Sequence, residues 1–147
     1  MNLTVRLVDI PQIPMVEAGL TEYLNKSEAW TQGRALSEDI VSFVKNGWMY
    51  LWVVLDKDTL EIYGYVISEI YAYPRTKALR IQYCAGVPHC MEHVEDEMFD
   101  TLERFAEDAG CTIVEWFGRP GWRTTAKKHG YGTQEVIFEK FLQGGHQ

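Results

Sequence analysis

The first side chains that could do chemistry are a group of thiols and imidazoles between residues 84 and 93. Cys90 and His93 are three residues apart, which places both on one helical turn, and Cys84 and His89 lie upstream. Thiolate and imidazole are the ligands that zinc prefers in proteins. A complete site would need groups from a strand end and a loop, and the chain has no second Cys-x-x-Cys or His pair. We therefore expect no metal site.

Charge is unevenly distributed along this chain, whose net charge is -7. The segment 92–108 holds eight acidic residues against one base, Arg104. A basic group follows it, made of Arg119, Arg123, Lys127 and Lys128. The acidic balance argues against a general nucleic-acid binder, because phosphate contacts need a clustered positive surface. The two charged segments could steer a charged partner, or they could be ordinary solvated helix faces.

Length and composition indicate one ordered domain. The 147 residues are 46% hydrophobic and 24% charged, which is typical of a globular chain. We expect a single domain over residues 1–147, with a flexible tail at 142–147. The start of the chain does not resemble a signal peptide, and no run approaches the ~18 apolar residues of a membrane helix. Three cysteines without a repeating framework favour reduced thiols, so we expect a cytoplasmic protein.

Periodicity along the first half of the chain predicts a strand, two helices and a hairpin. The apolar side chains first alternate, then recur at helical spacing, and then form two runs of strand formers separated by a turn. The expected elements are a strand over 2–9, a helix with the apolar face Val16, Leu20, Tyr23 and Leu24, a loop over 25–34, a helix capped by Ser37 and ended near Gly47, and strands over 49–55 and 62–71.

The second half alternates between strands and helices. A third strand completes a meander, and a long helix then has an apolar face that ends at Gly110. The expected elements are a strand over 79–84, a helix with the inner face Val94, Met98, Leu102, Phe105 and Ala109, a strand over 112–117, a helix over 122–129 and a final strand over 136–141.

The order and the closing segment of these elements resemble the GCN5-related N-acetyltransferase (GNAT) family. The segment from Cys111 to Phe117, the residues Lys128-His129-Gly130-Tyr131 and the last strand look like that family's closing strand, helix, turn and strand. Ala106 and Gly110 match its Ala-x-x-x-Gly helix ending. The resemblance implies an α/β (α+β) fold, with a mixed, mostly antiparallel central sheet flanked by helices on both faces.

Within this family the chain looks closest to small acetyltransferase-like proteins of tailed bacteriophages. The strand residues Trp52-Val53-Val54 and the loop Gly118-Arg119-Pro120-Gly121-Trp122 carry this likeness. It implies a phage-encoded protein that is found in the host cytoplasm or in the virion.

The family's cofactor loop is altered in this chain. In the family, backbone N–H groups of this loop hold the coenzyme A pyrophosphate at a helix N-terminus, and its glycines leave room for the phosphate oxygens. The matching positions here are Cys90, His93 and Glu95, and the carboxylate of Glu95 would repel a pyrophosphate. If acetyl-CoA binds, the candidate binding residues are Cys84, Gly86, Val87, His93 and Glu95.

The family's catalytic groups are also only partly matched. The resemblance implies a tyrosine on the penultimate helix that protonates the leaving thiolate, and that position is Ala126. Tyr131 is the nearby substitute. A general base is sought on the central strands, where Glu69 and Glu115 are the candidates. Either carboxylate could instead be an outward-facing polar residue of a half-exposed strand.

These departures favour a degenerate GNAT-fold protein that acts through protein contacts, in a virion component or against a host factor, without acetyl transfer and without a cofactor. The expected contact residues are Trp122, Arg119 and Trp48, because amphipathic rings and arginine often anchor partners. We expect no nucleic acid or membrane partner, and the sequence leaves the oligomeric state open. The alternative is an acetyl-CoA-dependent N-acetyltransferase with a divergent cofactor loop.

Overall fold

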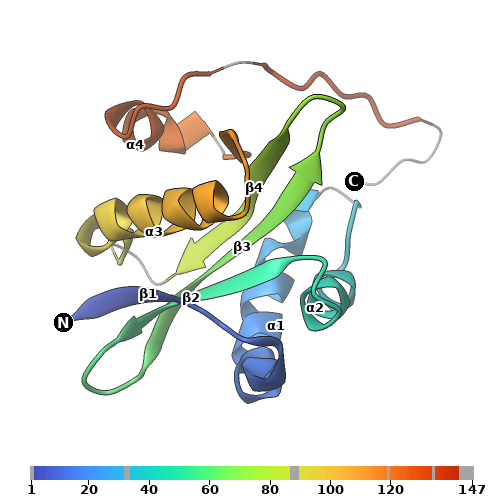
Figure 1. Cartoon of the computed structure of the whole chain (residues 1–147). Coiled ribbons are helices and arrows are strands. Elements are labelled where there is room, and N and C mark those ends of the chain that lie inside the picture. Colours follow the sequence, from blue (N-terminus) through green and yellow to red (C-terminus); the bar gives the residue numbers. More distant parts are fainter. Residues whose placement is uncertain (1, 32–33, 87–89, 119, 134, 143–147) are drawn as a thin grey trace.

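A five-stranded sheet forms the centre of the computed structural model, which describes residues 2–31, 34–86, 90–118, 120–133 and 135–142. The strands follow the chain in the order β1-β2-β3-β4-β5 (Figure 1). The first four are antiparallel to their neighbours, and β5 is parallel to β4. Their bounds are β1 (Leu3–Leu7), β2 (Tyr50–Asp56), β3 (Ile62–Ala72), β4 (Lys77–Gly86) and β5 (Ile113–Trp116).

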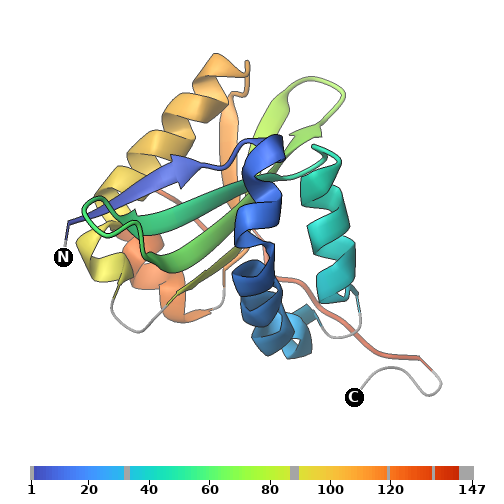
Figure 2. The ribbon, with the colours of Figure 1, turned by 90° about the horizontal axis from the view of Figure 1, so that it is seen from below.

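Helices lie on both faces of this sheet, as Figures 1 and 2 show. One face is covered by α1 and α2, and the other by α3, with α4 beside it. The main helices are α1 (Ile13–Thr31), α2 (Ser37–Lys45), α3 (Glu95–Asp108) and α4 (Arg123–Lys128), and the short 3-10 turns are η1 (Ile10–Gln12), η2 (Met91–His93) and η3 (Pro120–Trp122). None of the helices in the described ranges is long and apolar enough to cross a membrane. The mixed, mostly antiparallel sheet with helices on both faces confirms the predicted fold class.

Two hydrophobic clusters fill the layers, one on each side of the sheet. Successive strand residues point to opposite faces, so Val53 lies in the cluster under α1 and α2 while Val54 lies in the cluster under α3. The α3 cluster includes Leu79 and Ile81 of β4, and the largest helix side chain in it is Phe99. The predicted inner face of α3 omitted Phe99, which is nevertheless almost completely buried.

The first helix is longer than the sequence predicts. A loop was expected over 25–34, but α1 continues to Thr31. Leu20 and Leu24 are buried at helical spacing, whereas the last turns contain few apolar residues. A segment without an apolar face can therefore still continue a helix.

The start of α2 also differs from the prediction by one residue. Leu36, and not Ser37, precedes the helix, and its backbone N–H donates to Asp39 Oδ2 at 2.9 Å. Ser37 Oγ instead donates to Asn25 Oδ1 at 2.6 Å, which ties α2 to α1. The exit at Gly47 is confirmed, because its φ of 76° lies in the left-handed region that glycine tolerates.

The predicted final strand over 136–141 is wrong. Residues 135–142 join no strand of the described sheet and lead away from α4 toward the side of the molecule where α1 and α2 lie (Figures 1 and 2). Glu139 forms an ion pair with Arg34 at 2.6 Å. Strand-forming residues favour an extended backbone, but a strand also needs a neighbour that supplies the hydrogen bonds, and local sequence does not specify one here.

Candidate functional site

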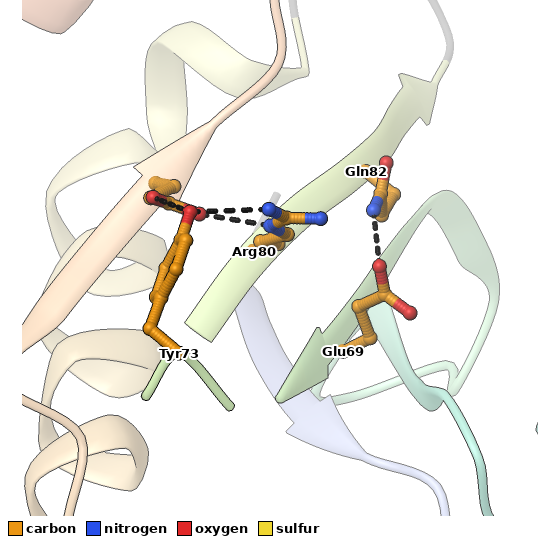
Figure 3. Close-up of polar contacts among 5 residues, drawn as sticks. Glu69, Tyr73, Arg80 and Gln82 are labelled. Atoms are coloured by element: carbon orange, nitrogen blue, oxygen red, sulfur yellow. Dashed lines mark hydrogen bonds and ion pairs between the residues drawn. The ribbon is translucent and has the colours of Figure 1, made fainter. Parts of the chain in front are cut away.

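The two carboxylates expected as general bases lie on the same face of the sheet, on either side of Arg80. In the strand register Glu69 of β3 is opposite Arg80 of β4, and Arg80 is opposite Glu115 of β5. The neighbours of Arg80 in β4, Leu79 and Ile81, both point into the α3 cluster. The three charged side chains therefore point to the opposite face, where Figure 3 shows Glu69 and Arg80 with Tyr73 and Gln82.

Glu115 is held by two hydrogen bonds. Its Oε1 accepts from Arg80 Nε at 2.9 Å, and its Oε2 accepts from the Tyr73 hydroxyl at 2.6 Å. Arg80 Nη2 also donates to the Tyr73 hydroxyl at 3.1 Å, which closes the triangle (Figure 3). Because both carboxylate oxygens already accept hydrogen bonds, Glu115 is poorly placed to take a proton from another group.

Arg80 is also surrounded by aromatic rings. Its guanidinium carbon lies 3.7 Å from the centre of the Tyr71 ring and 5.2 Å from that of Phe117. Burial disfavours its charged form, but the hydrogen bonds with Tyr73 and Glu115 outweigh this and raise the pKa of Arg80. The guanidinium is therefore a fixed positive charge at the centre of the patch.

Glu69 is less constrained. Its Oε1 accepts from Gln82 Nε2 at 2.5 Å, and its other carboxylate oxygen has no hydrogen-bond partner among the described residues. Gln82 is the extra residue of a β-bulge, since Ser68 pairs with Ile81 while Ile67 pairs with Tyr83. A bulge changes the direction in which the side chain of the extra residue points. Here the Gln82 side chain hydrogen-bonds to Glu69 and orients its carboxylate. Of the two expected bases, Glu69 is the one with a free oxygen.

Next to Glu69 and Gln82, one edge of β4 is open. The parallel pairing of β4 with β5 covers Ala78 to Ile81, and the hydrogen bond from Phe117 N–H to the Ile81 carbonyl at 3.1 Å follows it. From Gln82 to Gly86, β4 pairs with β3 on one side, and no described strand pairs with it on the other. Its outward backbone groups could therefore bind an extended ligand that carries amide groups.

The start of α3, where the altered cofactor loop was expected, is an electrostatic cluster. Glu95 Oε1 accepts from Lys128 Nζ at 2.7 Å, and His129 Nε2 lies 3.6 Å from the same oxygen and 3.4 Å from Asp96 Oδ1. The hydrogen bond from Lys128 outweighs partial burial and lowers the pKa of Glu95. The Glu95 carboxylate is therefore paired with Lys128 of α4, a contact that the sequence did not predict.

The described ones among the remaining expected cofactor residues come from the end of β4 and from η2. Burial, with a smaller effect from Cys90, raises the pKa of Cys84 to about 12. Cys90 is buried, and its Sγ donates to the Tyr63 carbonyl at 3.7 Å. Gly86 ends β4, His93 is exposed at the end of η2, and Val87 lies outside the described residues.

Tyr131 lies on the α3 side of the sheet, on the face opposite Glu69. Its hydroxyl donates to Glu103 Oε2 at 2.8 Å, and its ring contacts Phe99 with ring centres 5.2 Å apart. Burial, with Glu103 as a second cause, raises the pKa of Tyr131. The hydroxyl therefore keeps its proton strongly, and the geometry does not place it beside the expected bases.

The expected contact residues do not form one surface. Trp48 is 66% exposed and stacks on Phe43 of α2, with ring centres 5.6 Å apart. Trp122 is half-buried against Trp116, at 5.3 Å between ring centres, on the α3 side. Arg119 lies outside the described residues. A partner that touches both tryptophans would have to reach both faces of the sheet.

Comparison with known proteins identifies the fold through structure alone. No family model matches the sequence, and no curated protein matches it. An aminoglycoside acetyltransferase from an uncultured soil metagenomic sample is similar over 97% of this chain and 100% of its own, at 14% identity and a TM-score of 0.72. An acetyltransferase from Trypanosoma brucei covers 96% of this chain and 100% of its own, at 15% identity and a TM-score of 0.69.

A predicted acetyltransferase from Clostridium acetobutylicum, solved with acetyl-CoA, matches 95% of this chain and 96% of its own, at 15% identity and a TM-score of 0.68. These likenesses extend along nearly the whole chain, whereas the sequence identities are low. The chain has the fold of the GCN5-related N-acetyltransferases.

Proposed function

We propose that this protein transfers an acyl group from a coenzyme A thioester to an amine, with Glu69 as the general base. The observation that carries the proposal is the open edge of β4 from Gln82 to Gly86, which begins at the residue whose side chain holds the Glu69 carboxylate. The structural likeness to acetyltransferases, one of them solved with acetyl-CoA, supports the same reading.

The residues of this chain fit such a cofactor in two places. The open backbone groups of β4 would bind the amide groups of its pantetheine arm, and Lys128 would offer positive charge to its phosphates. Lys128 is largely exposed, so its ammonium can turn from Glu95 toward a phosphate. Acyl-coenzyme A would supply, when bound, an acyl group as an activated thioester: the amide bond to the amine forms as the C–S bond breaks, and coenzyme A leaves as the thiol.

The polar patch would prepare the amine for attack. A protonated amine is unreactive, so a base must remove its proton, and the free oxygen of Glu69 can accept it directly or through a water. Gln82 fixes the carboxylate by donating to its other oxygen. The charge of Arg80 is balanced by Glu115, which leaves Glu69 without an ion-pair partner among the described residues and favours a cationic acceptor.

Calorimetric titration with acetyl-CoA tests this proposal. We expect saturable binding with an affinity in the micromolar range, which is ordinary for enzyme substrates. Lys128→Glu should weaken the affinity about tenfold or more, because it replaces the cation near the phosphates with an anion. Lys26→Glu, an exposed substitution on α1, serves as the control and should leave the affinity unchanged. Absence of saturable binding by the wild-type protein would refute the proposal.

A second candidate function is protein binding without turnover, and the start of α3 favours it. Glu95 places a carboxylate where the family's loop has glycine or alanine, and Ala126 stands where the family has its catalytic tyrosine. The contact residues would be Trp122, Arg119 and Trp48, and Trp122→Ala should then lose a partner in a pull-down while its fold is kept. The structures named above do not bear on the phage origin or on a virion or host partner, which stay predictions.

A further inference from the structure

The guanidinium group of Arg80 keeps one edge that its neighbours do not use. Its Nε donates to Glu115, and its Nη2 donates to the hydroxyl of Tyr73. No described residue accepts a hydrogen bond from the third nitrogen, Nη1, which Figure 3 shows pointing toward the side of Gln82. A guanidinium carries five N–H groups, so this edge still has hydrogen bonds to donate.

Aromatic rings limit how a ligand can approach Arg80. The guanidinium carbon lies 3.7 Å from the centre of the Tyr71 ring, which is van der Waals contact and leaves no room for a ligand atom between them. The centre of the Phe117 ring lies 5.2 Å away. Tyr71 is 42% exposed and Phe117 is 51% exposed, so both rings also offer apolar surface to a ligand. A ligand would therefore bind at the Nη1 edge, with an apolar group against these rings.

The free oxygen of Glu69 belongs to the same region. Glu69 is opposite Arg80 in the register of β3 and β4, and opposite side chains on one face of a sheet begin about 5 Å apart. One oxygen of Glu69 accepts from Gln82, and no hydrogen bond to the other is found in the described ranges. A small molecule that carries a donor and an acceptor a few bonds apart can therefore bind both Glu69 and Arg80.

The charges of the polar patch select between the possible acceptor groups of such a ligand. Glu69 and Glu115 are acids and Arg80 is a base, so these three side chains together carry one excess negative charge. A ligand ammonium next to Glu69 balances it. A neutral carbonyl oxygen can then accept from Arg80 without adding charge, whereas a ligand carboxylate would also be repelled by Glu115, which shares the same guanidinium. The patch therefore favours an ammonium combined with a neutral carbonyl.

We propose that this site selects α-aminoacyl compounds, in which the carbon next to the amine carries a neutral carbonyl group, as in an amino acid amide. The ammonium pairs with Glu69, the carbonyl oxygen accepts from Arg80 Nη1, and the side chain of the ligand lies against Tyr71 and Phe117. Arg80 is thus a specificity-determining residue. That the bound amine is also the acylated one rests on the function proposed above, whereas the binding preference does not.

Calorimetric titration of the protein without any coenzyme A tests the preference with three ligands that share one apolar group. At about pH 6, where all three amines are protonated, we expect phenylalaninamide to bind at least about tenfold more tightly than phenethylamine, which lacks the carbonyl. Phenylalanine should bind more weakly than its amide, because its carboxylate would lie close to Glu115. No saturable binding of the amide, or an affinity no higher than that of either other ligand, would overturn the proposal.

This experiment separates the binding preference from acyl transfer. The protein can prefer phenylalaninamide and yet fail to bind acetyl-CoA, which would refute the proposed function and leave this inference standing. The reverse combination would refute only this inference. A short peptide that begins with phenylalanine distinguishes two sources of the α-aminoacyl group: tighter binding than phenylalaninamide points to a polypeptide N-terminus, and weaker binding points to a small amide.

Substitutions then assign the preference to its residues. Arg80→Lys keeps a positive charge next to Glu115 but removes the planar donor edge, so the amide should fall to the affinity of phenethylamine, whose own affinity stays unchanged. Glu69→Gln should weaken both ligands alike, because both lose the partner of their ammonium. Arg104→Lys, an exposed change on α3, is the matched control and should keep the preference. An Arg80→Lys protein that keeps the preference would overturn the proposal, and the wild-type comparison decides it even where a variant fails to fold.

Discussion

The Nε atom of Arg80 lies 2.9 Å from Oε1 of Glu115, and this ion pair joins β4 to β5 on the face of the sheet that carries Glu69. The two side chains are 19% and 24% exposed, so water screens them less than it screens a surface pair. Tyr73 completes the arrangement by donating to the other oxygen of Glu115. The ion pair between Arg80 and Glu115 therefore holds β5 against β4 just before the open edge of β4 begins.

Loss of this pair should destabilise the fold. Arg80→Ala leaves a half-buried carboxylate with one fewer partner, and we expect a loss of about 1–3 kcal/mol in the free energy of unfolding. Lys26→Ala removes a well-exposed ion pair with Glu22 and should cost less than about 0.5 kcal/mol. Urea unfolding of both variants measures the difference. Equal effects for the two would mean that the Arg80 pair is no stronger than a surface pair.

Gly19 should resist substitution although it lies inside α1. Alanine in an open helical position is more favourable than glycine by roughly 1 kcal/mol. At Gly19, however, an added Cβ would collide with the hydroxyl of Tyr65, which is buried in the cluster beneath the helix. We expect Gly19→Ala to destabilise the protein by about 1–3 kcal/mol, as overpacked sites do.

Gly121→Ala is the control for this substitution, because a Cβ there meets no atom within 4 Å. Thermal unfolding should show a lower midpoint for Gly19→Ala and little change for Gly121→Ala. A stabilised Gly19→Ala variant would show that α1 can move away from Tyr65 at no cost.

The Glu95 cluster predicts a loss of stability in acid. The hydrogen bond from Lys128 outweighs partial burial and lowers the pKa of Glu95 below its ordinary value of 4.5. A carboxyl group with a lowered pKa in the folded state contributes stability above its unfolded pKa, and this is lost as the pH falls through the folded pKa. We therefore expect this contribution to be present at pH 6 and to disappear below the ordinary value of 4.5.

Lys128→Met separates this contribution from that of other acids. The variant should be less stable than the wild type near neutral pH, and the difference should shrink as Glu95 becomes protonated. Urea unfolding across this pH range measures it. A difference that stays constant into the acid range would show that Lys128 stabilises the fold without acting on Glu95.

The thiols of Cys84 and Cys90 should react slowly. Burial raises the pKa of Cys84 to about 12 and also raises that of Cys90, so little thiolate forms near pH 8. We expect both thiols to react with a disulfide reagent many times more slowly in the folded protein than in urea. Rapid modification of either thiol at the rate of the unfolded chain would contradict this placement.

The sheet and its helices could be predicted because their signals are local. The runs of strand formers over 49–55 and 62–71 predicted β2 and β3, and glycines at positions 47 and 110 marked helix exits that the structure confirms with positive φ. The helical turns from 25 to 31 were missed because they have no apolar face, although hydrogen bonding along the helix does not require one.

The candidate site depends on pairings between distant residues, which a single sequence does not reveal. Glu69 and Glu115 could be named as carboxylates on strands, but their alignment on either side of Arg80 depends on strand register and on the bulge at Gln82. The neutralisation of Glu95 depends on Lys128, which is 33 residues away along the chain. Charge and residue type gave the candidates, and only the fold shows which of them have partners.

The most direct test of the proposed function is the rate of coenzyme A release from acetyl-CoA in the presence of amines, compared between the wild type and Glu69→Gln. The variant keeps the size of the side chain but cannot accept the proton, so kcat should fall about 10²-fold or more while the affinity for acetyl-CoA is unchanged. Glu107→Gln, an exposed change on α3, should keep the wild-type rate. The predicted result is an amine-dependent rate in the wild type that Glu69→Gln reduces in this way. Two results would contradict the account: no amine-dependent release of coenzyme A, or equal rates for the wild type and Glu69→Gln.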